Sequence, residues 1–93
     1  MHVIVARHYV VRGRVQGVGY RYFVRGIAER LGVNGFVRNL RSGDVEVHAE
    51  ADELTLRLFR QELERGPRMA EVSGVAESDV PVSGAYSAFL IRG

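Results

Sequence analysis

A glycine-rich segment near the N-terminus constrains this chain more than any other stretch. Three glycines fall within Gly13-Arg14-Val15-Gln16-Gly17-Val18-Gly19-Tyr20-Arg21, between a strand-like pattern and a helix-like pattern. Glycine adopts backbone conformations that other residues avoid, so this segment can turn its N–H groups inward. At the start of a helix such donors face whatever binds there, and we expect the ligand to be an anion.

The residues on the two sides of this segment have different periodicities. From Arg7 to Val15 the chain alternates, with Tyr9 and Val11 on one face, which predicts a half-buried strand. After the segment, apolar residues recur at spacings of three and four, which predicts an amphipathic helix that ends at Gly32. The apolar stripe of that helix consists of Tyr20, Val24, Ile27, Ala28 and Leu31. The glycine-rich segment is therefore a strand-to-helix turn.

A hairpin is expected next. A short strand over 36–40 and a longer strand over 45–51 flank a loop at 41–44 that is rich in turn-forming residues. The longer strand alternates, so one set of its side chains should face the core and the other a solvated sheet face. The inward set is Val45, Val47, Ala49 and Ala51, and the outward set is Glu46, His48 and Glu50.

The remaining segment predicts a second helix and two more strands. Asp52 can cap a helix that runs to about Arg65, where Gly66-Pro67 ends it. The buried stripe of this helix is Leu56, Phe59 and Leu63. A strand over 70–80, with a bulge suggested by Gly74, and a short strand over 89–92 complete the pattern.

The order strand, helix, strand, strand, helix, strand is that of an α+β ferredoxin-like sandwich (βαββαβ). Right-handed crossovers place both helices on the same face of one antiparallel sheet, which leaves the other face for solvent or a partner. The 93 residues are enough for one compact domain. We therefore expect a single domain over residues 1–93.

The composition excludes several kinds of site. Without cysteine there is no disulfide framework, thiol nucleophile or thiolate metal site. All 13 basic residues are arginine, which excludes the Gly-Lys-Ser/Thr loop of a Walker-type nucleotide site. His2, His8 and His48 are dispersed and predicted to point outward, so we expect no metal site. No long apolar run is present, and we expect a cytoplasmic protein that does not bind membranes.

Two side chains can complete an anion site at the glycine-rich turn. On this fold the turn and the far end of the second strand can approach each other, which would bring Arg21 close to Asn39. Arg21 falls in the first helical turn, where a cation is disfavoured unless an anion lies nearby. Its planar guanidinium suits two phosphoryl oxygens, and inward N–H groups can hold the third. The expected backbone donors are Gln16, Gly17, Val18, Gly19 and Tyr20.

Two segments closely resemble the signatures of the acylphosphatase family. They are Gly13 to Arg21 as quoted above and Gly35-Phe36-Val37-Arg38-Asn39-Leu40-Arg41-Ser42-Gly43-Asp44-Val45. Their spacing is that of the family, and the order of elements extends the resemblance over nearly the whole chain. Tyr20 departs from the family pattern, which more often has Phe or Met there, and Ala51 stands where a glycine usually closes the second signature.

The resemblance implies an enzyme that hydrolyses acyl phosphates to a carboxylate and inorganic phosphate. Arg21 would match the family's phosphate-binding catalytic arginine, and Asn39 the asparagine that orients the attacking water. No metal, other cofactor or covalent intermediate is implied. The expected partners are a small acyl phosphate and inorganic phosphate or a similar anion in the loop, and not nucleic acid. Small size favours a monomer. Arg12, Arg14, Arg38 and Arg41 are expected to form an exposed basic fringe.

Two alternatives stay open at this point. Ferredoxin-like domains can bind RNA through aromatic side chains on the open sheet face, although a net charge of +2 is not a strong basic footprint. Stacked aromatic rings on that face would favour RNA binding, and a phosphate-sized pocket at the turn would oppose it. The second alternative is a regulatory or maturation domain that holds an acyl or carbamoyl phosphate for another protein. Turnover of substrate would separate that domain from an enzyme.

Overall fold

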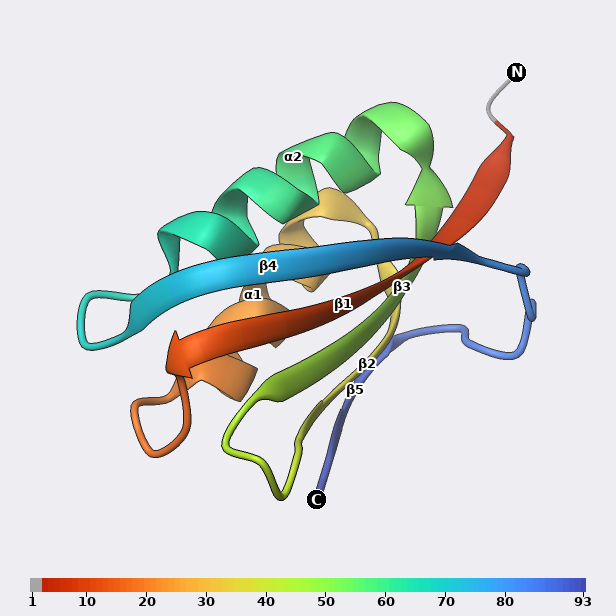
Figure 1. Cartoon of the computed structure of the whole chain (residues 1–93). Coiled ribbons are helices and arrows are strands. Elements are labelled where there is room, and N and C mark those ends of the chain that lie inside the picture. The colour runs from red at the N-terminus through yellow and green to blue at the C-terminus, as the bar shows by residue number, and fades with distance from the viewer. Residues whose placement is uncertain (1–2) are drawn as a thin grey trace.

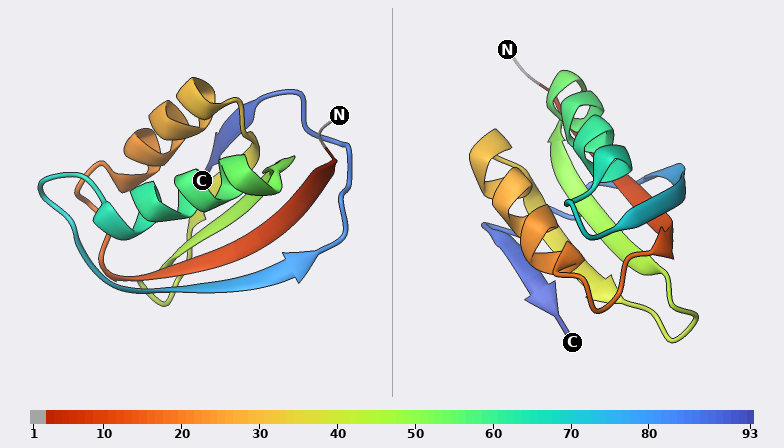
Figure 2. Two further views of the ribbon diagram at one scale, coloured as in Figure 1. Left: turned by 90° about the horizontal axis from the view of Figure 1, so that it is seen from above. Right: turned by 90° about the vertical axis from the view of Figure 1, so that its left-hand side faces the viewer.

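The computed structural model describes residues 3–93, so the expectation for His2 lies outside the described residues. The elements are β1 (Ile4–Arg14), α1 (Tyr20–Leu31), β2 (Asn34–Asn39), β3 (Val45–Asp52), α2 (Glu53–Arg65), β4 (Glu71–Val80) and β5 (Phe89–Arg92). Both helices cover one face of a five-stranded sheet (Figure 1, Figure 2), as the ferredoxin-like prediction requires. Neither α1 nor α2, the helices of the described residues, has the length and apolarity needed to span a membrane.

The hydrophobic core lies between the sheet and the two helices. Its side chains come from the inward positions of the alternating strands β1 and β3 and from the predicted apolar stripes of α1 and α2. The fully buried side chains include Tyr9, Val11, Val45, Val47, Tyr20, Val24, Phe59 and Leu63. Each buried aliphatic or aromatic side chain contributes about 1.5–3 kcal/mol relative to exposure. Tyr20 also donates from its hydroxyl to the carbonyl oxygen of Leu63 at 2.8 Å, which ties the start of α1 to α2.

The strand order across the sheet is β4-β1-β3-β2-β5. The pairs among the first four strands are antiparallel, but β5 runs parallel to β2, so the prediction of a wholly antiparallel sheet is wrong at this edge. The reason is the path of residues 81–88, called here the crossing segment. It leaves β4 at one edge of the sheet and reaches the opposite edge on the side away from the helices (Figure 1).

The helix boundaries agree closely with the sequence pattern, and the strand boundaries less closely. The Asp52 side chain accepts a hydrogen bond from the backbone N–H of Thr55 at 2.8 Å, which confirms the predicted cap of α2. In contrast, β1 begins at Ile4 and not at Arg7, because it pairs with β3 as far as Asp52. The bulge lies close to the predicted position, since Gly74 pairs opposite Arg12 while Val72 pairs opposite Gly13.

Glu50 departs from its predicted place on a solvated face. It is 5% exposed, because the crossing segment covers it. Its carboxylate accepts hydrogen bonds from His48 Nε2 at 2.7 Å, from the backbone N–H and hydroxyl of Ser83 at 2.9 and 2.8 Å, and from the N–H of Gly84 at 3.2 Å. Burial alone would raise the pKa of Glu50, but these hydrogen bonds outweigh it and bring the pKa to about 2.

An aromatic cluster also occupies the open sheet face. The Phe36 and His48 rings are stacked, with centroids 5.7 Å apart and planes inclined by 13°. Tyr86 of the crossing segment packs at 5.9 Å from Phe36 and 5.4 Å from His48, and the Arg92 guanidinium lies 4.3 Å from the Phe36 centroid. Aromatic groups therefore do gather on this face, but Tyr86 and Arg92 already pack against them.

Candidate active site

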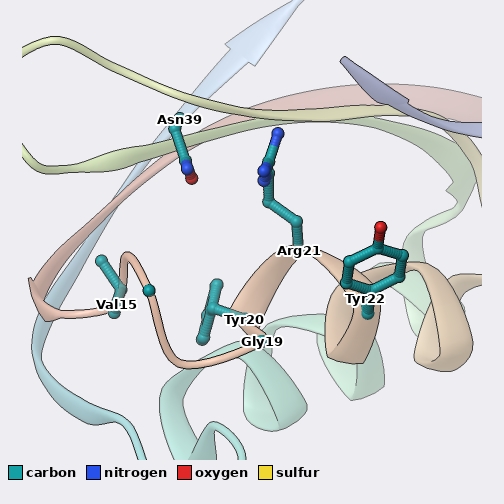
Figure 3. Close-up of a pocket in the computed structure, with 7 residues that line it drawn as sticks. Val15, Gly19, Tyr20, Arg21, Tyr22 and Asn39 are labelled. Atoms are coloured by element: carbon teal, nitrogen blue, oxygen red, sulfur yellow. The ribbon is translucent and has the colours of Figure 1, made fainter. Parts of the chain in front are cut away.

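The glycine-rich turn, Arg21 and Asn39 border one small cavity of about 100 Å³. Its lining residues are Val15, Gly17, Gly19, Tyr20, Arg21, Tyr22 and Asn39. Figure 3 shows the side chains of Arg21 and Asn39 above the turn, with Arg21 rising from the start of α1 and Asn39 descending from the end of β2. The structure thus brings together two side chains that lie far apart in the sequence.

The backbone of the turn leaves donors free. Gly17 and Gly19 have φ values of 75° and 76°, in the left-handed region that favours glycine. Among the described residues, no loop hydrogen bond is donated by the N–H groups of residues 16–19. Gly19 is the N-cap of α1 without a side-chain cap, and the first turn of the helix contains no acidic residue. The positive end of the helix dipole is therefore left for an external anion.

Arg21 adds a positive charge that the protein does not neutralise. Its Nη1 donates to the carbonyl oxygen of Arg92 at 2.8 Å, and within residues 3–93 it has no carboxylate partner. This bond to the end of β5 holds the guanidinium beside the cavity and leaves its other donors available. A guanidinium has five N–H donors in a planar fork, so most of its capacity can serve a bound anion.

The other arginines near the site differ from Arg21. Arg12 lies 3.9 Å from Asp44, and Arg14 lies 3.6 Å from Glu71. Arg38 donates from Nε to Glu46. All three remain substantially exposed, as predicted for a basic fringe, but paired carboxylates offset much of their charge. Arg41, the fourth residue of the predicted fringe, is exposed as well. Among the residues that line the cavity, the positive charge therefore comes from Arg21, to which the helix end adds its dipole.

Asn39 presents an unsatisfied polar atom at the site. It is the last residue of β2, directly before the hairpin loop. Its Oδ1 is buried and has no hydrogen-bond donor from the described part of the protein. Buried polar atoms in native structures nearly always have a partner, and an exception at a cavity indicates a place for a ligand or a reactant.

The side chain of Gln16 has a role that the sequence did not indicate. Its Nε2 donates to the carbonyl oxygens of Leu40 at 2.7 Å and Asp44 at 2.9 Å, the two residues that close the β2–β3 hairpin. One amide therefore links the glycine-rich turn to the hairpin next to Asn39. Gln16 and Val18 do not line the cavity, and Val18 packs against the core.

Two of the residues that line the cavity were not predicted as site residues from the sequence. Val15 ends the buried face that precedes the turn, and Tyr22 lies one residue beyond Arg21. Tyr22 is outside the apolar stripe of α1 and is 65% exposed. Its aromatic ring therefore does not pack in the core. Its position beside the predicted arginine was a signal that could have identified it.

Comparison with known proteins agrees with this arrangement. The profile of the acylphosphatase family matches residues 7–91. An acylphosphatase of Bifidobacterium longum is 48% identical over 79 residues, which is 85% of this chain and 81% of that protein. An acylphosphatase of Pseudomonas paraeruginosa is 47% identical over 88 residues, 95% of this chain and 96% of that protein. The chain belongs to the acylphosphatase family.

Solved structures agree with the sequence comparison. An acylphosphatase from Coxiella burnetii superposes with a TM-score of 0.91 at 38% identity, over 96% of this chain and 93% of that chain. The fold also occurs inside a much larger protein. Full-length HypF, in its phosphate- and nucleotide-bound form, superposes on 100% of this chain with a TM-score of 0.92 at 32% identity, which is 12% of HypF.

Proposed function

We propose that this acylphosphatase hydrolyses the carboxyl-phosphate bond of small acyl phosphates at the cavity between the glycine-rich turn and Asn39. Arg21 and the backbone N–H groups of residues 16–20 bind the phosphoryl group. Asn39 orients the attacking water through its side-chain amide. The RNA-binding alternative is not favoured, because the aromatic rings of the open face already pack against Tyr86 and Arg92.

One observation carries this assignment of roles. Arg21, which has no carboxylate partner among the described residues, borders the same cavity as Asn39, whose buried Oδ1 has no donor. A cation and free N–H groups suit a phosphoryl group, and an amide oxygen suits a water molecule that must donate a hydrogen bond. The residues of the cavity thus provide for both reactants.

The chemistry needs few groups from the protein. The water oxygen forms a bond to phosphorus as the bond between phosphorus and the acyl oxygen breaks, and the carboxylate leaves. The proton of the water passes to a phosphoryl oxygen of the substrate. Because a carboxylate is a good leaving group, no general acid is required. Phosphoryl transfer is catalysed mainly by positioning and by stabilising charge, which Arg21 and the turn supply.

The test is hydrolysis of benzoyl phosphate by the purified protein with a metal chelator present. We expect turnover to persist in chelator, and Arg21→Gln and Asn39→Ala each to lower kcat/KM by about 10²-fold or more, as for a lost electrostatic stabiliser. Arg41→Gln is the matched control for Arg21→Gln, because Arg41 is exposed and does not line the cavity. Its activity should equal that of the wild type.

Full activity in both cavity variants would contradict the assigned roles. A wild-type protein that binds phosphate without turnover would instead favour a regulatory or maturation domain of the kind considered from the sequence. We also propose that the enzyme acts as a cytoplasmic monomer with inorganic phosphate as its bound product. Sedimentation at micromolar concentration would test the monomer, and competitive inhibition by phosphate would test the bound product.

A further inference from the structure

We propose that Tyr22 contacts the acyl group of the substrate, so that the site prefers aromatic acyl phosphates to acetyl phosphate. This inference rests on the proposed function, because it concerns the part of the substrate that leaves. The cavity is small. A volume of about 100 Å³ is smaller than the roughly 150 Å³ of an apolar cavity that binds one benzene molecule.

Such a cavity accommodates a phosphoryl group and little more. The groups suited to that anion, Arg21 and the turn, lie within it together with Asn39. In a displacement at phosphorus, the attacking and leaving oxygens lie roughly in line on opposite sides of the phosphorus atom. The acyl group must then extend from the cavity to its rim, where it contacts whichever side chain is exposed there.

Tyr22 is the aromatic lining residue with an accessible ring. The other aromatic lining residue, Tyr20, is 1% exposed, and its hydroxyl is bonded to the Leu63 carbonyl. Tyr22 is 65% exposed, and Figure 3 shows its ring beside the base of Arg21. The two functional side chains are thus neighbours on the first turn of α1.

The ring of Tyr22 also has a neighbour on α1. The Arg25 guanidinium lies 5.4 Å from the ring centroid, within the range of a cation–π contact. Arg25 is three residues further along α1, so the contact joins neighbours on one face of the helix. A ring with this contact has less side-chain freedom to lose when it stacks on an aromatic acyl group.

The experiment compares kcat/KM for benzoyl phosphate and acetyl phosphate. We expect Tyr22→Ala to lower kcat/KM for benzoyl phosphate by about fivefold to tenfold, which lies within the range of about twofold to twelvefold for one aromatic contact. The value for acetyl phosphate should fall by less than about twofold. Tyr22→Phe should retain the wild-type preference. The competitive inhibition constant of inorganic phosphate should not change in either variant.

The matched control is Leu54→Ala, which truncates a side chain of similar exposure, 67%, on the other helix and away from the cavity. Its kcat/KM for both substrates should equal that of the wild type. An equal loss for both substrates in Tyr22→Ala, or no loss for benzoyl phosphate, would overturn the proposal.

A binding measurement separates failure of this proposal from failure of the proposed function. Benzoylphosphonate and acetylphosphonate lack the bridging oxygen and are not hydrolysed at that bond. Tyr22→Ala should weaken only benzoylphosphonate binding, by about fivefold to tenfold, measured by calorimetry. If the wild type hydrolyses neither acyl phosphate, the proposed function fails, while the ratio of the two phosphonate affinities still supports or overturns the role of Tyr22.

Discussion

The crossing segment and the glycine-rich turn each carry backbone N–H groups beside a glycine with positive φ, and they differ in what those groups meet. In the crossing segment, the N–H groups of Ser83 and Gly84 donate to the Glu50 carboxylate, and Gly84 has a φ of 65°. In the glycine-rich turn, Gly17 and Gly19 have similar φ values and line a cavity, and their N–H groups donate no loop hydrogen bond to the described residues. One set of donors binds an anion of the chain itself.

The comparison shows how one kind of backbone geometry can serve either stability or binding. At Glu50 the carboxylate and its donors satisfy each other, which fixes the crossing segment to the sheet. At the turn, Arg21 adds positive charge, and within the described residues no acidic side chain lines the cavity or pairs with Arg21. Donors that the chain satisfies are structural, whereas donors left facing a cavity are available to a ligand.

The largest effect expected from testing this comparison is on stability at Glu50. Glu50→Gln keeps the size of the side chain but places an NH₂ group, which is itself a donor, against the donors of Ser83 and Gly84. We therefore expect the free energy of unfolding to fall by about 2 kcal/mol. Activity should stay within about twofold of the wild type, because Glu50 does not line the cavity. Urea unfolding and benzoyl phosphate hydrolysis measure the two quantities.

The pH dependence of unfolding gives a second measurement on the same residue. The pKa of Glu50 is about 2 in the folded protein, against an ordinary value of 4.5. As the pH falls, the unfolded chain takes up the proton first, so the stabilisation is complete above about pH 4.5 and is lost toward pH 2. Glu50→Gln should have a shallower loss of stability in that window. An identical slope in both proteins would show that Glu50 is not held as described.

A smaller effect is expected from loosening the link between the turn and the hairpin. Gln16→Met removes both donors to Leu40 and Asp44 while keeping the side-chain length, and it should lower kcat by about tenfold, since small misplacements of reacting groups are costly. The inhibition constant of inorganic phosphate should change less, because the turn and Arg21 remain.

Gln61→Met is the control for this variant, because Gln61 is exposed on α2 and away from the cavity. It should have wild-type kcat. A wild-type kcat in Gln16→Met would mean that the hairpin keeps Asn39 in position without the amide link.

The smallest expected effect is stabilisation by inorganic phosphate. At five times its dissociation constant, a ligand of the folded state alone stabilises by about 1 kcal/mol. In urea unfolding, phosphate should raise the free energy of unfolding of the wild type and of Glu50→Gln by this amount equally. That of Arg21→Gln should hardly change. An equal gain in Arg21→Gln would place phosphate binding elsewhere and remove the contrast between the two sets of donors.

Much of the fold could be predicted because it follows from local periodicity. The stripes of α1 and α2, the Asp52 cap and the inward residues of β3 each depend on neighbours within a few positions. The direction of β5 could not be predicted in this way. It depends on where the crossing segment leads, and no local pattern specifies the path of a connection across a sheet.

The same distinction applies to the site. The glycine-rich turn and Arg21 are adjacent in sequence, so their chemistry could be interpreted together. The predicted fold allowed Asn39 to approach them, and the resemblance to acylphosphatases supplied the roles of the two side chains. The amide of Gln16 and the ring of Tyr22 could not be assigned from the pattern. Their partners are the hairpin, 24 and 28 residues away for Gln16, and the rim of a cavity for Tyr22.

The sequence by itself determined the strand-to-helix turn, both helices and the segments that mark the family, because these are set by residue type and short-range spacing. Tertiary structure alone decided which donors are satisfied. Alternation sends Glu50 to the open face, but the crossing segment returns to bury it and supplies Ser83 and Gly84 as donors. Whether a polar group ends as part of the fold or is left for a ligand depends on which distant segments the chain brings against it.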